Sequence, residues 1–192
     1  MTTTKTGTAS RYGSGIAAVC ATLALTAHAG EPLTLQMHWL QVPGSHEIKS
    51  GRYEAGVERL EARANRGISS ASRRTAVLID LCVGYIMSNQ IEKATTTCNE
   101  ATTTGWYRDV TYNNRGVLNL LLGRHDAAIQ DFSVAVQDSR RSKASERVAS
   151  SNQRLADEQR VAAARQPSEQ VLFAGTADLH GVSPGKLQME IR

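Results

Sequence analysis

The sequence predicts an all-α fold of packed helical hairpins, and three observations lead to this prediction. Through the middle of the chain, apolar and small residues recur three and four positions apart, which is the spacing of one helix face. The pattern around Leu78 and Ala94 returns around Tyr112 and Ala128, which indicates a structural repeat. Of the 192 residues, 41% are apolar but only 5% are aromatic, which suits Ala, Leu and Val packed between helices better than a β-sandwich.

The N-terminal segment, residues 1–29, has the features of a secretory signal peptide. Lys5 and Arg11 give a positive start, an apolar stretch of about a dozen residues covers 16–27, and residues 27–29 have the A-x-A pattern that signal peptidase requires. The apolar stretch is shorter than the roughly 20 residues that span a bilayer. We therefore expect export to the bacterial periplasm and cleavage after Ala29. A membrane anchor is the alternative if the signal is retained.

The charge of the remaining chain argues against a nucleic-acid partner. Lys5 and Arg11 leave with the signal, so 20 of the 22 basic residues remain against 18 acidic ones. Binding of phosphate backbones needs concentrated basic residues, which this near-balance does not provide.

Two units of the repeat match position by position without an insertion. The matched pairs are Leu78 and Tyr112, Leu81 and Arg115, Cys82 and Gly116, Tyr85 and Asn119, Ala94 and Ala128, Cys98 and Phe132, and Ala101 and Ala135. A polar break divides each unit, at 88–90 in the first and at 123–125 in the second. Gly123 can adopt the positive φ of a helix C-cap. Each unit is therefore predicted to be a helix–turn–helix hairpin.

A helical hairpin that repeats with a period of about 34 residues resembles the tetratricopeptide repeat family, whose signature combines an aromatic residue, Leu-Gly, a Tyr, and later Ala and Phe. The second unit carries Tyr112, Gly116, Gly123, Ala128, Phe132 and Ala135. It departs from the signature at Arg115, where Leu is expected, and at Arg140, where Pro is expected. The first unit has Cys82 and Cys98 at the Gly and Phe positions. Residues 50–60 look like the second helix of an incomplete earlier repeat.

The resemblance covers roughly residues 45–140 and implies a short array of about two and a half repeats. A polar helical run over 142–165 has a thin apolar stripe, which suits a C-terminal capping helix. Its basic residues raise the question of an anionic partner, but Glu146, Asp157 and Glu158 alternate with them and favour a solvated outer face. The expected organisation is a signal peptide at 1–29, an extended segment at 30–44, a helical domain at 45–165 and a loosely ordered tail at 166–192.

Cys82 and Cys98 are predicted to form a disulfide bond. Cys20 leaves with the signal, so an even pair remains in an oxidising compartment. Both are equally far from Gln90 at the centre of the turn, about 12 Å along their helices. Facing residues at equal height can reach disulfide geometry, and the bridge would stabilise the hairpin by roughly 3 kcal/mol. Two buried free thiols, or a redox or metal role, are the alternatives.

The sequence contains no recognisable catalytic or metal-binding constellation. His38, His46, His125 and His180 are scattered, and none lies at ligand spacing from another. We find no nucleophile–base pair, paired carboxylates or glycine-rich phosphate loop. The prediction is a protein without enzymatic activity, metal, cofactor or small-molecule substrate.

In the family that this chain resembles, the first helix of each hairpin lines a concave groove that binds a peptide or protein segment. The corresponding residues here are Ile79, Val83, Ile86, Asn113, Asn114, Val117 and Leu120. Asn114 stands where some relatives bind a C-terminal carboxylate. Ala76 and Asp80 stand where Lys and Asn would complete that clamp, so a carboxylate clamp is not predicted. An apolar groove with two amides suits an extended or helical segment with aliphatic anchors. The alternative is that the protein's own tail covers this surface.

These features predict an exported, non-enzymatic module for protein–protein interaction. A structural component of an envelope complex is the first alternative. A thiol-redox protein that uses Cys82 and Cys98 is the second.

Overall fold

The computed structural model of the chain describes residues 32–38, 42–139, 142–165 and 189–192. Within them lie β1 (Leu33–Leu35), α1 (Ser45–Lys49), α2 (Tyr53–Asn65), α3 (Ala71–Met87), α4 (Ile91–Thr103), α5 (Arg108–Leu121), α6 (His125–Asp138), α7 (Lys143–Arg165) and β2 (Met189–Ile191). The predicted helical fold is therefore confirmed. The predicted signal peptide lies outside the described residues.

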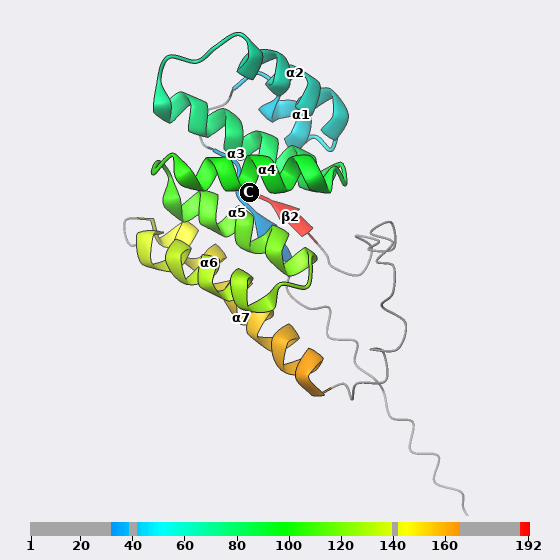
Figure 1. Cartoon of the computed structure of the whole chain (residues 1–192), viewed down its shortest axis with the longest axis vertical. Coiled ribbons are helices and arrows are strands. Elements are labelled where there is room, and N and C mark those ends of the chain that lie inside the picture. The colour runs from blue at the N-terminus through cyan, green and yellow to red at the C-terminus, as the bar shows by residue number, and fades with distance from the viewer. Residues whose placement is uncertain (1–31, 39–41, 140–141, 166–188) are drawn as a thin grey trace, which may run out of the picture.

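The helices stack in chain order, from α1 and α2 at one end of the molecule to α7 at the other (Figure 1). Each helix packs against the next one along the chain, and α7 covers α6 and reaches α5. None of the helices in the described ranges is both long and apolar enough to cross a membrane.

Three turns within this stack have nearly the same backbone conformation. Gly51, Asn89 and Gly123 are left-handed, with φ of 77°, 57° and 71°. The next residue in each case has φ near −90° and ψ between 65° and 68° and precedes the first helical residue. Glycine and asparagine adopt this conformation at the lowest cost, so the polar breaks in the sequence mark the turns correctly. The tetratricopeptide assignment itself stays a prediction.

The two long hairpins each have a pair of facing residues at equivalent positions. In the α3–α4 hairpin this pair is Cys82 and Cys98, whose sulfurs are 2.00 Å apart with a sequence separation of 16. The predicted disulfide is thus confirmed. In the α5–α6 hairpin the pair is Gly116 and Phe132, and a Cβ atom on Gly116 would lie only 2.6 Å from the Phe132 ring.

A small parallel sheet joins the two ends of the described chain. Leu33 pairs with Met189, and Leu35 pairs with Ile191. The pairing continues beyond the strands, because the Met37 N–H donates to the Arg192 carbonyl at 2.8 Å. Figure 1 shows the sheet lying across the middle of the helical stack. The sequence pattern predicted neither strand, and the strand at 189–191 differs from the loose tail expected there.

Candidate functional site

The predicted groove residues are all buried. They are Ile79, Val83, Ile86, Asn113, Asn114, Val117 and Leu120. Most of them belong to one apolar core that also contains Leu33, Leu35 and Met37 from the N-terminal segment. The surface predicted to hold a partner is therefore covered by residues 33–38 of the same chain. The C-terminal strand β2 pairs with the outer edge of this segment.

Polar side chains of the helices hold this segment by its backbone at every second residue. At Thr34, the N–H donates to Asn152 Oδ1 at 2.9 Å, and the carbonyl accepts from Asn152 Nδ2 at 2.8 Å. Asn113 Nδ2 donates to the same carbonyl at 3.0 Å. At Gln36, Asn114 accepts the N–H at 2.8 Å and donates to the carbonyl at 2.7 Å.

The third of these contacts is at Asp80, whose Oδ1 accepts the His38 N–H at 2.9 Å. We call Asp80, Asn113, Asn114 and Asn152 the backbone clamp. Successive residues of a strand direct their backbone groups to opposite edges, so β2 pairs with one edge of β1 and the clamp replaces a neighbouring strand on the other. Because the clamp contacts only N–H and C=O groups, its hydrogen bonds do not depend on which side chains the held segment carries.

Asp80 is the one ionisable member of the clamp. Its second oxygen accepts a hydrogen bond from Ser45 Oγ, and burial raises the pKa of its carboxyl group to about 6. The hydrogen bonds from Ser45 and from the His38 backbone oppose this shift, since both favour the ionised form. A carboxyl group thus performs, in α3, the task that Asn114 performs in α5.

The sequence predicted only half of the clamp. Asn113 and Asn114 were among the candidate groove residues, whereas Asp80 counted as a departure from a carboxylate clamp and Asn152 was not singled out. A signal for Asn152 existed in the pattern. It lies one helical turn from each of two buried residues, Val148 and Ala156, so a polar residue stands on the apolar stripe of α7.

An open groove of about 1520 Å³ remains between the sheet and α7. Its floor is formed by Thr34, Gln36 and His38, and Glu190 and Arg192 of the C-terminal segment border it. Its far wall is the N-terminal half of α7, with Lys143, Glu146, Arg147, Ser150, Ser151 and Arg154. Tyr107 and Asp109 also line it, and the Tyr107 and His38 rings meet edge to face with centroids 4.1 Å apart.

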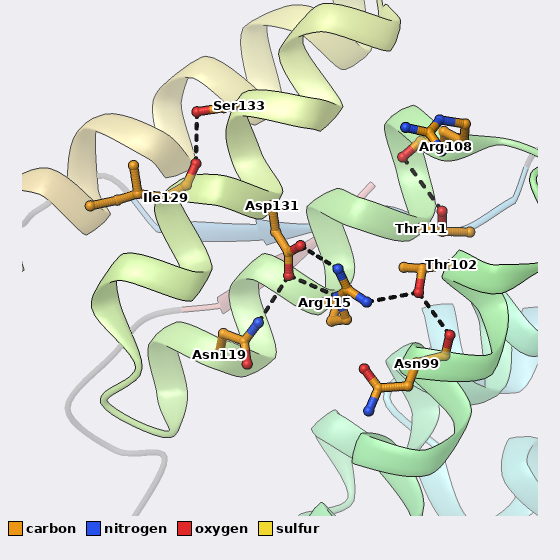
Figure 2. Close-up of polar contacts among 9 residues, drawn as sticks. All are labelled: Asn99, Thr102, Arg108, Thr111, Arg115, Asn119, Ile129, Asp131 and Ser133. Carbon is orange, nitrogen blue, oxygen red and sulfur yellow. Dashed lines mark hydrogen bonds and ion pairs between the residues drawn. The ribbon is translucent and has the colours of Figure 1, made fainter.

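A second polar cluster lies between α4, α5 and α6 and includes Thr102, Arg115, Asn119 and Asp131 (Figure 2). Arg115 forms two bonds to Asp131, at 2.6 and 2.9 Å, and a third to Thr102 Oγ1 at 2.9 Å. Asn119 donates to the same carboxylate at 2.9 Å. These contacts explain why Arg115 stands where the repeat signature has Leu, and they give the cluster a role in packing the helices.

The described part of the chain contains no group of three or more His, Cys, Asp or Glu residues arranged to hold a metal ion. Both disulfide cysteines are buried, with at most 1% of their surface exposed. No protein-family model, curated protein or solved structure matches this chain.

Proposed function

We propose that this protein is an exported, non-enzymatic module that binds an extended segment of another protein on its concave face. One observation carries the proposal. Side chains of α3, α5 and α7 already hold an extended polypeptide, residues 33–38, by hydrogen bonds to its backbone, and its alternate apolar side chains are buried. Proteins that recognise extended peptides use this combination of backbone bonds and alternating pockets.

The held segment, residues 33–38, which we call the resident strand, leaves the groove beside it open to a partner. The groove beside it is open, has a polar floor and a helical wall, and is larger than typical sites for small ligands. A partner segment would lie in this groove, next to the sheet, without displacing β1. Export rests on the signal-peptide features of residues 1–29.

A redox role finds no support in the geometry. A reactive cysteine needs an accessible sulfur in an electropositive setting. Cys82 and Cys98 are bonded to each other and buried, so their sulfurs lack that access. Burial favours a structural bridge.

A random peptide library displayed on phage, selected on the full-length protein, tests the proposal. We expect enriched peptides that bind the purified protein and compete with one another. Ser150→Trp places a bulky side chain on an exposed position of the groove wall and should weaken binding at least tenfold. Thr96→Trp, at an exposed position of α4 outside the groove, is the matched control. The proposal fails if no peptide is enriched, or if the two variants affect binding equally.

A further inference from the structure

We infer that the outer edge of β1 is a binding site for an extended segment of a partner protein, and that β2 occupies this site until the partner displaces it. The inference goes beyond the proposed function, in which a partner lies in the groove and leaves the sheet intact. Three observations lead to it: the separate bonding of the two edges of β1, the weaker anchoring of β2, and the side chains that the edge accepts.

The two edges of β1 are bonded through different residues. The clamp bonds the backbone of the even-numbered residues, from Thr34 to His38. On the opposite edge, the Leu35 carbonyl accepts the Arg192 N–H at 2.9 Å, and the Met37 N–H donates to the Arg192 carbonyl at 2.8 Å. Departure of β2 would therefore break none of the bonds to the clamp, and β1 would stay in place with an unpaired edge. Such an edge is a template for another extended chain.

β2 is anchored less firmly than β1. Every residue of the resident strand is buried, with at most 8% of its surface exposed. In contrast, Met189, Glu190 and Ile191 are partly exposed and Arg192 is exposed. Among the described elements, β2 makes extensive contact with β1 alone. β2 should therefore leave more readily than β1, because fewer buried contacts hold it in place.

The side chains of β2 show what kind of segment the edge accepts. Met189 and Ile191 are partly buried and pack against the hydrophobic core, whereas Glu190 and Arg192 border the groove. A replacement segment needs apolar side chains at the first two of these positions and polar side chains at the other two, and it runs parallel to β1. The partner segment thus alternates apolar and polar residues and is bonded through its backbone, as in other complexes formed by strand addition.

Native-state hydrogen exchange, measured by NMR on the full-length protein, tests whether the sheet opens at β2. The N–H groups of Met37 and Arg192 bond across the sheet, whereas those of Gln36 and His38 are held by the clamp. We expect protection factors at least tenfold lower for the first two than for the second two, because β2 opens while β1 stays clamped. Equal protection would mean that the two strands leave together, and would overturn the inference.

Fluorescence anisotropy with peptides tests the edge as a binding site. The probe is a fluorescein-labelled peptide with the sequence of residues 187–192, and two derivatives carry an N-methyl group at the position of Arg192 or of Ile191. The Arg192 N–H donates to Leu35, whereas the alternation of the strand directs the Ile191 N–H away from β1. Methylation at the Arg192 position should weaken binding at least tenfold, and methylation at the Ile191 position should leave it unchanged. Equal losses would overturn pairing with β1.

Variants of β2 test the competition for this edge. Met189→Asp combined with Ile191→Asp removes the apolar contacts of β2, so the unmodified peptide should bind this variant at least tenfold more tightly than wild type. Val161→Asp, at an exposed position of α7, is the control and should bind the peptide as wild type does. Equal affinity of wild type and the β2 variant would mean that β2 does not occupy the site of the peptide. If the β2 variant does not fold, hydrogen exchange and the two methylated peptides on wild type decide.

Sedimentation of the full-length protein separates a partner protein from a second copy of this chain. We expect a wild-type monomer. A dimer that dissociates when Met189 and Ile191 are replaced would assign the edge to β2 of the second copy and overturn the inference. Failure here leaves the proposed function standing, because that function is tested by library peptides and Ser150→Trp in the groove.

Discussion

The α3–α4 and α5–α6 hairpins place different chemistry at the same three consecutive positions. Residues 80, 81 and 82 of the first correspond to residues 114, 115 and 116 of the second. In the order of the chain, these positions face the resident strand, the neighbouring helices, and the other helix of the same hairpin.

At the position that faces the other helix of the same hairpin, the α3–α4 hairpin has a covalent bond, and the α5–α6 hairpin has a glycine packed against an aromatic ring. Cys82 is bonded to Cys98, whereas Gly116 leaves room for the ring of Phe132, which is fully buried. At the middle position, Leu81 and Thr97 correspond to the ion pair of Arg115 and Asp131. At the position that faces the resident strand, Asp80 corresponds to Asn114. The same backbone arrangement is therefore stabilised by different side-chain interactions in the two hairpins, and separate substitutions can test each interaction.

The largest effect is expected at the buried ring of the second hairpin. Phe132→Ala removes a side chain with no exposed surface and leaves a cavity beside Gly116, so the free energy of unfolding should fall by about 3–5 kcal/mol. Urea unfolding followed by circular dichroism measures this loss. Val161→Ala, at a position that is 43% exposed, is the control and should cost less than about 0.5 kcal/mol. A loss at Phe132 no larger than that of the control would mean that Gly116 and Phe132 do not hold the hairpin together.

The covalent link of the first hairpin should contribute slightly less. The double variant Cys82→Ala and Cys98→Ala opens a loop with a sequence separation of 16, and the free energy of unfolding should fall by about 3 kcal/mol. The reciprocal double variant, Gly116→Cys and Phe132→Cys, tests whether the two hairpins are equivalent. We expect it to form a second disulfide, detected by mass spectrometry after alkylation without reductant. Two alkylated thiols in the folded variant would show that the equivalence does not extend to side-chain geometry.

At the position that faces the resident strand, the substitutions Asp80→Asn and Asn114→Asp should each change how stability depends on pH. Burial raises the pKa of Asp80 to about 6 from an ordinary value of 3.8, so the native state binds more protons than the unfolded state between these values. Its contribution to stability is therefore fully present below about pH 4 and is lost as the pH rises through about 6. The loss amounts to up to about 3 kcal/mol.

Asp80→Asn should accordingly stabilise the protein at neutral pH and make little difference in mild acid. Asn114→Asp should destabilise the protein at neutral pH. It adds a buried carboxyl group next to the Gln36 backbone and removes a donor to the Gln36 carbonyl. Thermal unfolding of the three proteins across this pH range measures both effects. Parallel curves for wild type and Asp80→Asn would contradict a raised pKa at this site.

The sequence predicted the helices and the disulfide because each leaves a local signal. Helical spacing, the turn residues at Asn89 and Gly123, and the equal distances of Cys82 and Cys98 from the turn all lie within one hairpin. The turn at Gly51 was harder to recognise as part of the repeat, because the interval from Gly51 to Asn89 is longer than the interval from Asn89 to Gly123.

The segment that covers the predicted groove residues, 33–38, left no comparable signal in the sequence. Strand β1 has only three residues and pairs with β2 at the other end of the described chain, so neither strand has enough alternation to be recognised alone. The clamp joins residues from α3, α5 and α7, and only packing brings them together. Asp80 was misjudged for the same reason. Its role depends on a backbone N–H from a segment that the repeat pattern does not include.

The smallest effect is expected at the middle position, and there it depends on what replaces the ion pair. Arg115→Leu alone introduces the residue of the first hairpin but leaves the Asp131 carboxylate buried with Asn119 as its remaining donor. Loss of one partner of a fully buried pair costs about 3–5 kcal/mol. The Arg115 side chain is 25% exposed, so water screens part of the interaction and we expect a loss of about 2 kcal/mol.

Removal of both charges should restore most of this stability. Adding Asp131→Thr, the counterpart of Thr97, to Arg115→Leu should return stability to within about 1 kcal/mol of wild type, because no buried charge remains. Urea unfolding of both single variants and the double variant gives the coupling energy directly. Additive losses would mean that the carboxylate and the guanidinium stabilise the helices separately, and that the two hairpins differ here in more than the choice of residues.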